Sequence, residues 1–305
     1  EIDEALEDFI AKIEKEIVLT FHTVLPKPIN VLKDKIMRLS AMVNIIIVMT
    51  NSSANILKND YSVNKDKIVV IPHGTHLISM IDKKLLKKQL KLDYKFVIST
   101  FGLLGEGKNI ESTIQALPEI IKKHPDVIFL IIGKTHPNIL KEVGEDYRKT
   151  LKSLIIKNNL QKNVKFIDEF LPTDKLLEYL QLTDIYLFTS KDRNQAVSGT
   201  FSYALGSGCP IISTPIPHAI EMLTSENGIL IDFESPKQLS KAVTSLLNNK
   251  PKRDLIRYNA INVTAPTSWE NSAIRHAELF SRLENSNIKL IYDIPPINLN
   301  HLINL

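Results

Sequence analysis

The chain has 305 residues, 44% of them hydrophobic and 24% charged, a composition typical of a soluble globular protein with two domains of ordinary size. A net charge of +4 without a long block of basic residues argues against a nucleic-acid partner. The single cysteine, Cys209, excludes an internal disulfide and a cysteine-based metal cluster, and it fits a cytoplasmic location. We expect neither a signal peptide nor a transmembrane helix, because no run approaches the roughly 20 apolar residues that span a bilayer.

Helices and strands alternate over the first part of the chain. Apolar residues at helical spacing predict amphipathic helices over 1–15 and 29–41, and Asn51-Ser52-Ser53 is a candidate N-cap for a helix through Lys58. Runs rich in β-branched residues predict strands at 17–21, 45–49 and 67–71.

The alternation restarts after a polar, lysine-rich stretch at 83–95. Further strands are expected at 96–101, 127–132, 164–167, 184–189, 211–212 and 229–231. Helices are expected after residue 109 as far as 123 and at 147–157, 174–182, 236–247, 252–261 and 268–283, with a short one after Thr200. Such alternation predicts an α/β fold with parallel sheets covered by helices on both faces.

Two loops at the carboxyl ends of expected strands are candidate anion sites. The stretch 194–214 leaves a strand as a polar loop and turns through Ser198-Gly199-Thr200 into a helix of small residues. Free backbone N–H groups and the helix dipole attract an anion at such a point, although an ordinary strand–helix turn has the same pattern. The loop from Gly102 to Lys108 has three glycines and one ammonium, which suit a diphosphate, but its spacing is neither that of the dinucleotide-binding pattern nor that of a Walker loop. A surface lysine after a turn is the alternative interpretation.

Three histidines, His22, His73 and His136, each follow an expected strand, which makes them candidates for chemistry, with His73 and His136 as secondary ones. Glu145, Tyr147 and Arg148 are interpreted as a salt-linked surface. No acidic or histidine cluster has the spacing of a metal site, and no pair of carboxylates stands at glycosidase-like positions.

In their order and spacing, these pieces resemble the retaining glycosyltransferases of the GT-B fold, group 1 (family 4), over most of residues 16–285. The stretches that carry the resemblance are 20–22, 70–74, 102–108, 131–133, 164–166, 184–186, 194–214 and 268–270. The nearest likeness is to a bacterial subgroup with Gln-x-x-Ser-Gly-Thr in the loop that here begins at Gln195.

The resemblance implies two Rossmann-like lobes, with a nucleotide-diphosphate sugar bound mainly by the second. A hexose would pass to a carbohydrate or lipid-linked acceptor held by the first. His22 and Gln195 would be catalytic. The implied donor-binding residues are Gly102, Gly105, Lys108, Phe166, Ser198, Gly199, Thr200 and Tyr203. These enzymes generally need no metal or other cofactor, because lysine, helix dipole and amides supply the positive charge.

The chain departs from the family pattern at three positions. The family normally has a glutamate, seven residues and another glutamate where this chain has Gln195 and Tyr203, and it commonly has an arginine at Leu103. Glutamine cannot carry negative charge, and tyrosine cannot accept a ribose diol as a carboxylate does. A catalytically inactive GT-B module that binds nucleotide-sugar or glycan is therefore an alternative, as is another GT-B enzyme, an epimerase or a phosphorylase.

We expect four segments: a partial first lobe at 1–90, a nucleotide-sugar lobe at 91–265, a helix crossing back at 266–285, and a linker or further region at 286–305. The first lobe has fewer strands than the family's, so the sequence is interpreted as a partial glycosyltransferase. Lys33, Lys35 and Arg38 would let the helix 29–41 touch an anionic membrane surface, but a solvated face is the favoured interpretation.

Overall fold

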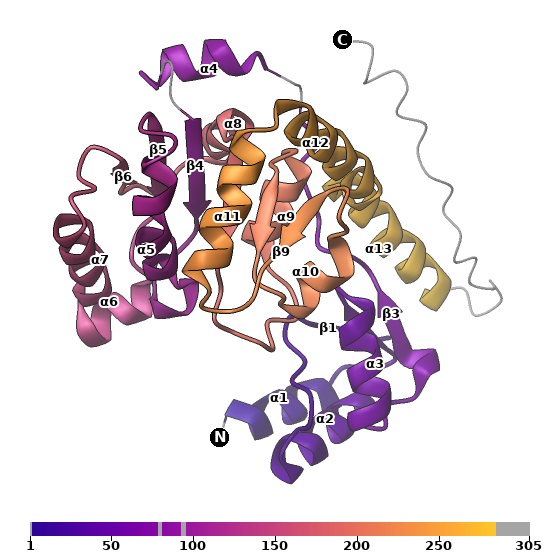
Figure 1. The fold of residues 1–305 in the computed structure, drawn as a ribbon. Coiled ribbons are helices and arrows are strands. Elements are labelled where there is room, and N and C mark those ends of the chain that lie inside the picture. The colour runs from indigo at the N-terminus through magenta and orange to yellow at the C-terminus, as the bar shows by residue number, and fades with distance from the viewer. Residues whose placement is uncertain (1, 79–80, 93–95, 285–305) are drawn as a thin grey trace. The chain divides into compact units, whose positions relative to one another are not determined.

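The computed structural model describes residues 2–78, 81–92 and 96–284, and the chain divides into two compact units (Figure 1). Of the described residues, the first unit contains those up to Thr75, the segment Asn194–Ser198 and those from Ala265 to Glu284. The second contains His76–Arg193 and Gly199–Thr264. The first segment of this unit thus ends at Thr75, earlier than the residue 90 predicted from the sequence. The expected linker at 286–305 lies outside the described residues.

The first unit is built on a three-stranded parallel sheet with the order β1-β2-β3. The strands are β1 (Val18–Phe21), β2 (Ile45–Val48) and β3 (Ile68–Val70). The helices are α1 (Ile2–Ala11), α2 (Asn30–Met42), α3 (Asn51–Asp60) and α13 (Trp269–Glu284), with a short 3-10 turn, η1 (Lys65–Lys67). Alternate side chains of β2 face opposite ways. Ile46 and Val48 share a core with residues of α1, α2 and α3, whereas Ile45 and Ile47 pack with Leu279 of α13.

The second unit is built on a six-stranded parallel sheet with the order β6-β5-β4-β7-β8-β9. Its strands are β4 (Phe96–Phe101), β5 (Val127–Ile132), β6 (Val164–Ile167), β7 (Ile185–Phe188), β8 (Ile211–Ser213) and β9 (Gly228–Leu230). From β4 the chain builds outward to β6 and then returns to add β7 on the other side of β4. The strand order therefore reverses between β4 and β7, and ligands of open α/β sheets bind beyond the carboxyl ends of strands at such a point.

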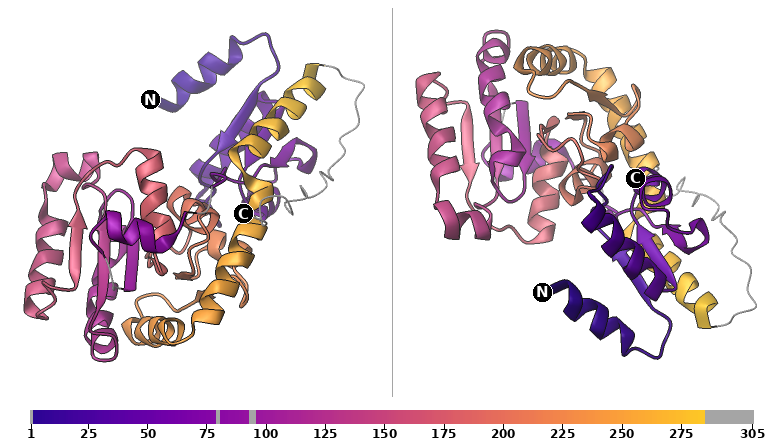
Figure 2. Two further views of the ribbon diagram at one scale, coloured as in Figure 1. Left: turned by 90° about the horizontal axis from the view of Figure 1, so that it is seen from above. Right: turned by 90° about the horizontal axis from the view of Figure 1, so that it is seen from below.

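Helices cover both faces of this sheet, as Figure 2 shows from two sides. They are α4 (Lys83–Gln89), α5 (Ile110–Ile121), α6 (Pro137–Val143), α7 (Asp146–Lys157), α8 (Thr173–Leu182), α9 (Gly199–Gly206), α10 (Pro217–Met222), α11 (Pro236–Leu247) and α12 (Lys250–Thr264). On one face Ile98 and Phe129 share a core with α5, α7 and α11. On the other face Val97 and Leu130 pack with α4 and α8. The prediction of an α/β fold with both faces covered is confirmed.

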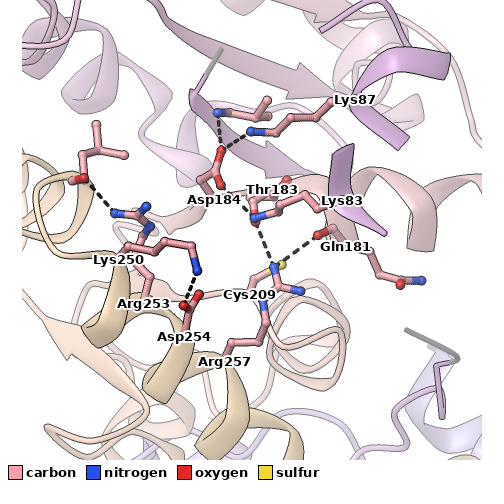
Figure 3. A network of polar contacts seen from close by, with 12 residues as sticks. Lys83, Lys87, Gln181, Thr183, Asp184, Cys209, Lys250, Arg253, Asp254 and Arg257 are labelled. Carbon is pink, nitrogen blue, oxygen red and sulfur yellow. Dashed lines mark hydrogen bonds and ion pairs between the residues drawn. The ribbon is translucent and has the colours of Figure 1, made fainter. Parts of the chain in front are cut away.

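A buried carboxylate fixes α4 to the amino ends of β4 and β7 (Figure 3). Asp184 pairs with Lys83 at 2.8 Å and with Lys87 at 2.7 Å, and it accepts the Val97 backbone N–H at 2.8 Å. Arg257 of α12 donates to the carbonyls of Gln181 and Thr183 at the end of α8, where the helix dipole favours a cation. These contacts make the network a structural anchor.

Three helices were missed by the sequence analysis: α4, α6 and α10. The lysines at 83–95 suggested only a polar stretch, yet Asp82 caps α4 by accepting the Lys84 N–H at 2.7 Å, and Leu86 is buried beneath it. The cap of α3 is also one residue earlier than expected, because Thr50 accepts the Ser53 N–H at 3.1 Å.

On the polar face of α2, Arg38 pairs with Glu7 of α1 at 3.0 Å. In the part of the chain that the structure describes, every helix is too short or too polar to span a lipid bilayer.

Candidate functional site

The loops that follow β4 and β7 are tied together at the point where the strand order reverses. After β4 the chain passes through the 3-10 turn η2 (Glu106–Lys108) and through Asn109, in the left-handed conformation with φ 51°, into α5. Thr189, just after β7, donates its hydroxyl to the carbonyls of Lys108 and Asn109 at 2.9 and 3.1 Å. The Lys191 N–H donates to the Gly107 carbonyl at 2.9 Å. The glycine-containing loop is therefore held rigidly by its neighbour.

Two glycines let the ends of β4 and β5 approach closely. Gly102 and Gly133 have φ of 129° and 127°, which side chains rarely adopt. A Cβ at Gly133 would lie 2.2 Å from the Gly102 carbonyl oxygen. The pairing continues beyond both glycines, since the Leu104 N–H donates to the Lys134 carbonyl at 2.8 Å and the His136 N–H to the Leu104 carbonyl at 3.0 Å. Glycine is thus required at Gly133 to shape the loop before Lys108.

Lys108 is the central charge of this loop. Its ammonium forms no hydrogen bond or ion pair with the described residues, and it lies 5.8 Å from the centre of the Phe188 ring. A Cβ built on Gly102 would lie 3.1 Å from Lys108 Nζ and 3.0 Å from Thr200 Cγ2, so the lysine tip reaches the first turn of α9. Burial lowers the pKa of Lys108 to about 8. A half-buried cation without a carboxylate partner is a favourable place for an anion.

Gly199 and Thr200 form the first turn of α9, as expected. Thr200 hydrogen-bonds with the hydroxyl of Tyr186, whose pKa is raised by burial. Tyr186 comes from β7, so a buried side chain links that strand to the start of α9. The structure brings together four of the predicted donor-binding residues: Gly102, Lys108, Gly199 and Thr200. Gly105 lies in the same loop, and a Cβ there would lie 2.6 Å from the Ile139 side chain of α6.

Tyr203, which stands where the family has a glutamate, is one member of an aromatic group. Its ring lies 6.5 Å from that of Phe101 in a stacked arrangement and 4.8 Å from that of His76 edge to face. Phe101 is the last residue of β4, so Tyr203 lies at the same carboxyl end as Lys108. The position therefore presents an aromatic surface where a carboxylate would present two acceptors.

The predicted catalytic residues belong to the first unit. His22 directly follows β1 and is exposed. Gln195 and Ser198 lie in the segment Asn194–Ser198, whose contacts assign it to that unit. His73 follows β3 and donates Nδ1–H to the Gly74 carbonyl at 2.8 Å, and its pKa is lowered mainly by burial and to a lesser degree by His22. His22 and His73 are therefore near each other at the carboxyl end of the first sheet.

Trp269, at the start of α13, covers the chain that follows His73. Its ring lies directly on Gly74, where a Cβ would be 2.2 Å from the nearest ring atom, and 5.4 Å from the His73 ring. The Thr75 N–H donates to the Thr267 carbonyl and the Trp269 N–H to the Thr75 carbonyl, both at 2.9 Å. The end of the first sheet is thus completed by residues far along the chain.

Two of the candidate residues, His136 and Phe166, make contacts that stabilise the fold. His136 caps α6, since its Nδ1 accepts the Asn138 N–H at 3.2 Å. Phe166 lies within β6, where its partly buried ring packs against the core and beneath the Arg148 guanidinium, 5.4 Å from the ring centre. The loop after β6, and not Phe166 itself, is therefore the part that extends beyond the sheet.

The salt link predicted among Glu145, Tyr147 and Arg148 is present between Glu145 and Arg148 at 2.9 Å, but the prediction that these residues form a surface was wrong for two of the three. Tyr147 and Arg148 are buried. Tyr147 donates its hydroxyl to Glu111 at 2.6 Å and accepts the Ile110 N–H at 3.0 Å, which supports the start of α5. Local sequence missed this because both partners lie more than thirty positions away. Thr189 and Tyr186 were missed for the same reason.

The described residues contain no group of three or more histidine, cysteine, aspartate or glutamate side chains that could hold a metal ion. Positive charge at the candidate site comes from the Lys108 ammonium and from the N-terminus of α9.

Comparisons with known proteins identify the family and the fold of the chain. The family model described as "Glycosyl transferases group 1" matches residues 82–263, which run from just before α4 to the last turn of α12. Among curated proteins, spore coat protein SA of Bacillus subtilis (strain 168) is 28% identical over 195 residues, 62% of this chain and 49% of that protein. A D-inositol 3-phosphate glycosyltransferase of Corynebacterium diphtheriae is 24% identical over 237 residues, 75% of this chain and 54% of that protein. The chain thus spans about half the length of these relatives.

Among solved structures, Anabaena Alr3699/HepE in complex with UDP has a TM-score of 0.76 at 20% identity, covering 92% of this chain and 76% of that one. Sucrose-phosphate synthase from Thermosynechococcus elongatus has a TM-score of 0.75 at 18% identity, covering 93% and 72%. At these identities the likeness establishes the fold, which is the GT-B fold that the sequence predicts.

Proposed function

This chain belongs to the glycosyl transferases group 1 family, and from that membership we propose that it transfers a hexose from a nucleotide-diphosphate sugar to a carbohydrate or lipid-linked acceptor. We further propose that transfer retains the anomeric configuration and that the chain falls in family 4, within the subgroup that has Gln-x-x-Ser-Gly-Thr. Both finer assignments rest on the sequence resemblance.

The main observation that supports the proposal concerns Lys108. Its ammonium is half-buried where the strand order reverses between β4 and β7, and it has no counter-ion among the described residues. Keeping such a charge out of water costs free energy unless an anion binds to it. The first turn of α9 supplies backbone N–H groups beside it. A diphosphate fits this arrangement, and the family and the UDP complex of a protein with the same fold support a nucleotide-sugar.

We propose that the sugar reacts next to His22 and Gln195, which belong to one unit. Gln195 would hydrogen-bond a hydroxyl of the donor sugar, and His22 would stabilise charge that develops during transfer. Lys108 and the α9 amides would supply the positive charge that a metal ion supplies in other transferases, so we propose a metal-independent reaction. A single free, buried cysteine supports our proposal of a cytoplasmic location.

The first experiment is calorimetric titration of the chain with UDP, GDP and their glucose and mannose conjugates, without metal and then with magnesium. We expect micromolar binding of at least one nucleotide, unchanged by magnesium. Lys108→Ala should weaken that binding by about a hundredfold, the effect of removing a close charge pair from a dry site. The matched control is Lys191→Ala, because Lys191 lies in the facing loop but already pairs with Glu111 at 2.6 Å.

Equal affinity of the Lys108→Ala variant and the unsubstituted chain would contradict the diphosphate assignment. Release of nucleotide from the sugar conjugate in the presence of acceptors then tests transfer. Gln195→Ala should lower turnover more than donor binding, and equal losses of both would remove Gln195 from a catalytic role.

A binding module without turnover is the second candidate, favoured by the aromatic packing of Tyr203 where the family has a carboxylate. Such a module would bind nucleotide-sugar with the same dependence on Lys108. Hexose transfer to any acceptor would exclude this candidate, so the transfer assay decides between the two.

A further inference from the structure

A buried arginine joins the carboxyl ends of β5 and β6. Arg148 of α7 donates Nη2–H to the Gly133 carbonyl at 3.2 Å and pairs through the same nitrogen with Asp168 Oδ1 at 2.9 Å. Its Nε–H donates to Glu145 Oε2 at 2.9 Å, and the Thr135 hydroxyl donates to that same oxygen at 2.5 Å. Thr135, Glu145, Arg148 and Asp168 form what we call the Arg148 cluster.

The two carboxylates of the cluster differ in what they offer a ligand. Hydrogen bonds from Thr135 and then Arg148 lower the pKa of Glu145. Asp168 is 57% exposed, and its Oδ2 has no hydrogen bond or ion pair in the described part of the chain. The Arg148 guanidinium pairs with both carboxylates, and attraction by Lys152 also lowers the pKa of Glu145. The cluster therefore presents Asp168 as an oriented acceptor, and it favours a ligand edge made of N–H donors.

The position of Asp168 fits the far end of a nucleotide whose diphosphate is at Lys108. Asp168 directly follows β6, which is separated from β4 by β5 alone. Neighbouring strands are about 4.8 Å apart, so the ends of β4 and β6 are about 10 Å apart, which is comparable to the span from diphosphate to base. Phe170, 82% exposed in the same loop, offers a free aromatic face to a planar ring. This step rests on the proposed function.

Nucleobases differ in the edge they would present to Asp168. Guanine has two adjacent donors, N1–H and the 2-amino group, which a carboxylate accepts together. Uracil has one N–H between two carbonyl oxygens, and these oxygens would be repelled by the carboxylate. We propose that Asp168, held in orientation by Arg148, makes the donor site select a guanine nucleotide.

The test is calorimetric titration of the full chain with GDP, with inosine diphosphate, which lacks the 2-amino group, and with UDP. We expect GDP to bind at least tenfold more tightly than UDP, with inosine diphosphate between them. Asp168→Asn should reduce the GDP-to-UDP ratio at least tenfold, because an amide replaces one acceptor oxygen by a donor. Glu169→Gln is the control, since it removes an adjacent exposed carboxylate outside the Arg148 cluster. It should leave the ratio unchanged.

Three outcomes overturn the inference. UDP binding as tightly as GDP, or an Asp168→Asn variant with an unchanged ratio, would refute base selection while leaving the proposed function intact. Failure of the folded chain to bind any of the three diphosphates would refute the proposed function and the inference together. Circular dichroism and the melting temperature of both variants establish that each is folded. A third variant, Phe170→Leu, tests the position of the base independently of the carboxylate, because it should weaken the binding of GDP and of UDP alike.

Discussion

At the scale of single residues, the role proposed for Lys108 would make nucleotide affinity depend on pH. Its pKa in the free protein is lowered to about 8 by burial, and a bound diphosphate would raise that pKa again. Below about pH 8 the lysine is protonated in the free protein and in the nucleotide complex, so its titration does not change the affinity. Above that pH the lysine of the free protein is largely neutral, and it must take up a proton when the nucleotide binds.

We therefore predict that nucleotide affinity is level up to about pH 8 and then falls by about tenfold for each further pH unit, as linkage requires. The measurement is the dissociation constant from about pH 7 to about pH 9.5. Lys108→Arg should bind with a level profile, because arginine stays protonated throughout this range. A profile shared by both proteins would assign the titration to another group.

Gly133 should tolerate no side chain. Alanine there combines a φ of 127° with a Cβ 2.2 Å from the Gly102 carbonyl oxygen. We predict that Gly133→Ala lowers the free energy of unfolding by about 3 kcal/mol or more, measured by urea denaturation. Gly144→Ala is the comparison, because its φ of 66° is also positive but nothing lies within 4 Å of the new Cβ. It should cost about 1 to 3 kcal/mol from backbone strain alone and less than Gly133→Ala, and equal costs would show that the contact with the Gly102 carbonyl contributes nothing.

At the scale of elements, the strands could be predicted and α4 could not. The ranges of β4, β5 and β6 agree with the sequence prediction, because long β-branched runs are typical of strands covered on both faces. The lysines of α4 hide its helical pattern. Lys83 and Lys87 face inward only because Asp184, some hundred residues later, is buried between them. Propensity carries no information about such a partner.

Asp184 is the residue through which α4 is attached. Burial alone would raise its pKa, but attraction by Lys83 and Lys87 more than offsets this, so the pKa is lowered. Because the folded-state pKa lies below the unfolded value of about 3.9, the stabilisation is present above that pH and is lost as the pH falls through the folded-state value. Acid should therefore release α4.

We predict that Asp184→Asn costs about 3 to 5 kcal/mol of unfolding free energy, since it leaves buried lysines without a counter-charge. Asp254→Asn breaks the exposed pair with Lys250 in the same region and should cost about 0 to 1 kcal/mol. Urea denaturation near neutral pH measures both. A similar small cost for both variants would mean that Lys83 and Lys87 are solvated in solution.

At the scale of the whole molecule, each hydrophobic core belongs to a single unit. The cores around Ile46 and around Leu279 lie in the first unit, and the three others described lie in the second. Separate cores favour separate unfolding transitions. Leu279 is 4% exposed and covers one face of the first sheet from α13, more than two hundred residues after β2.

We predict that calorimetry shows two unfolding transitions. Leu279→Ala should lower the midpoint temperature of only one of them, with a loss of about 2 to 5 kcal/mol in the unfolding free energy of that unit. A saturating nucleotide diphosphate should raise the other transition, because it stabilises the unit that binds it. Phe280→Ala, which removes a half-exposed neighbour on the same helix, is the control and should change neither transition by much. A single transition that both treatments shift would refute independent cores.

Only part of the candidate site could be predicted from the sequence. The glycines, Lys108 and the Gly199-Thr200 turn could be predicted, because their residue types and order along the chain carry the signal. The packing of Tyr203 and the Arg148 cluster could not, because each depends on side chains from elements far apart in sequence.

The burial of the only cysteine provides an intrinsic reporter of opening. Cys209 is fully buried, its thiol donates to the Leu180 carbonyl at 3.0 Å, and burial raises its pKa to about 12. A thiol reagent can therefore modify the native chain only after the second unit opens around that position. The rate of modification, followed with no introduced label, measures the opening free energy of the unit, and slower modification with added nucleotide would report binding there without any assay of transfer.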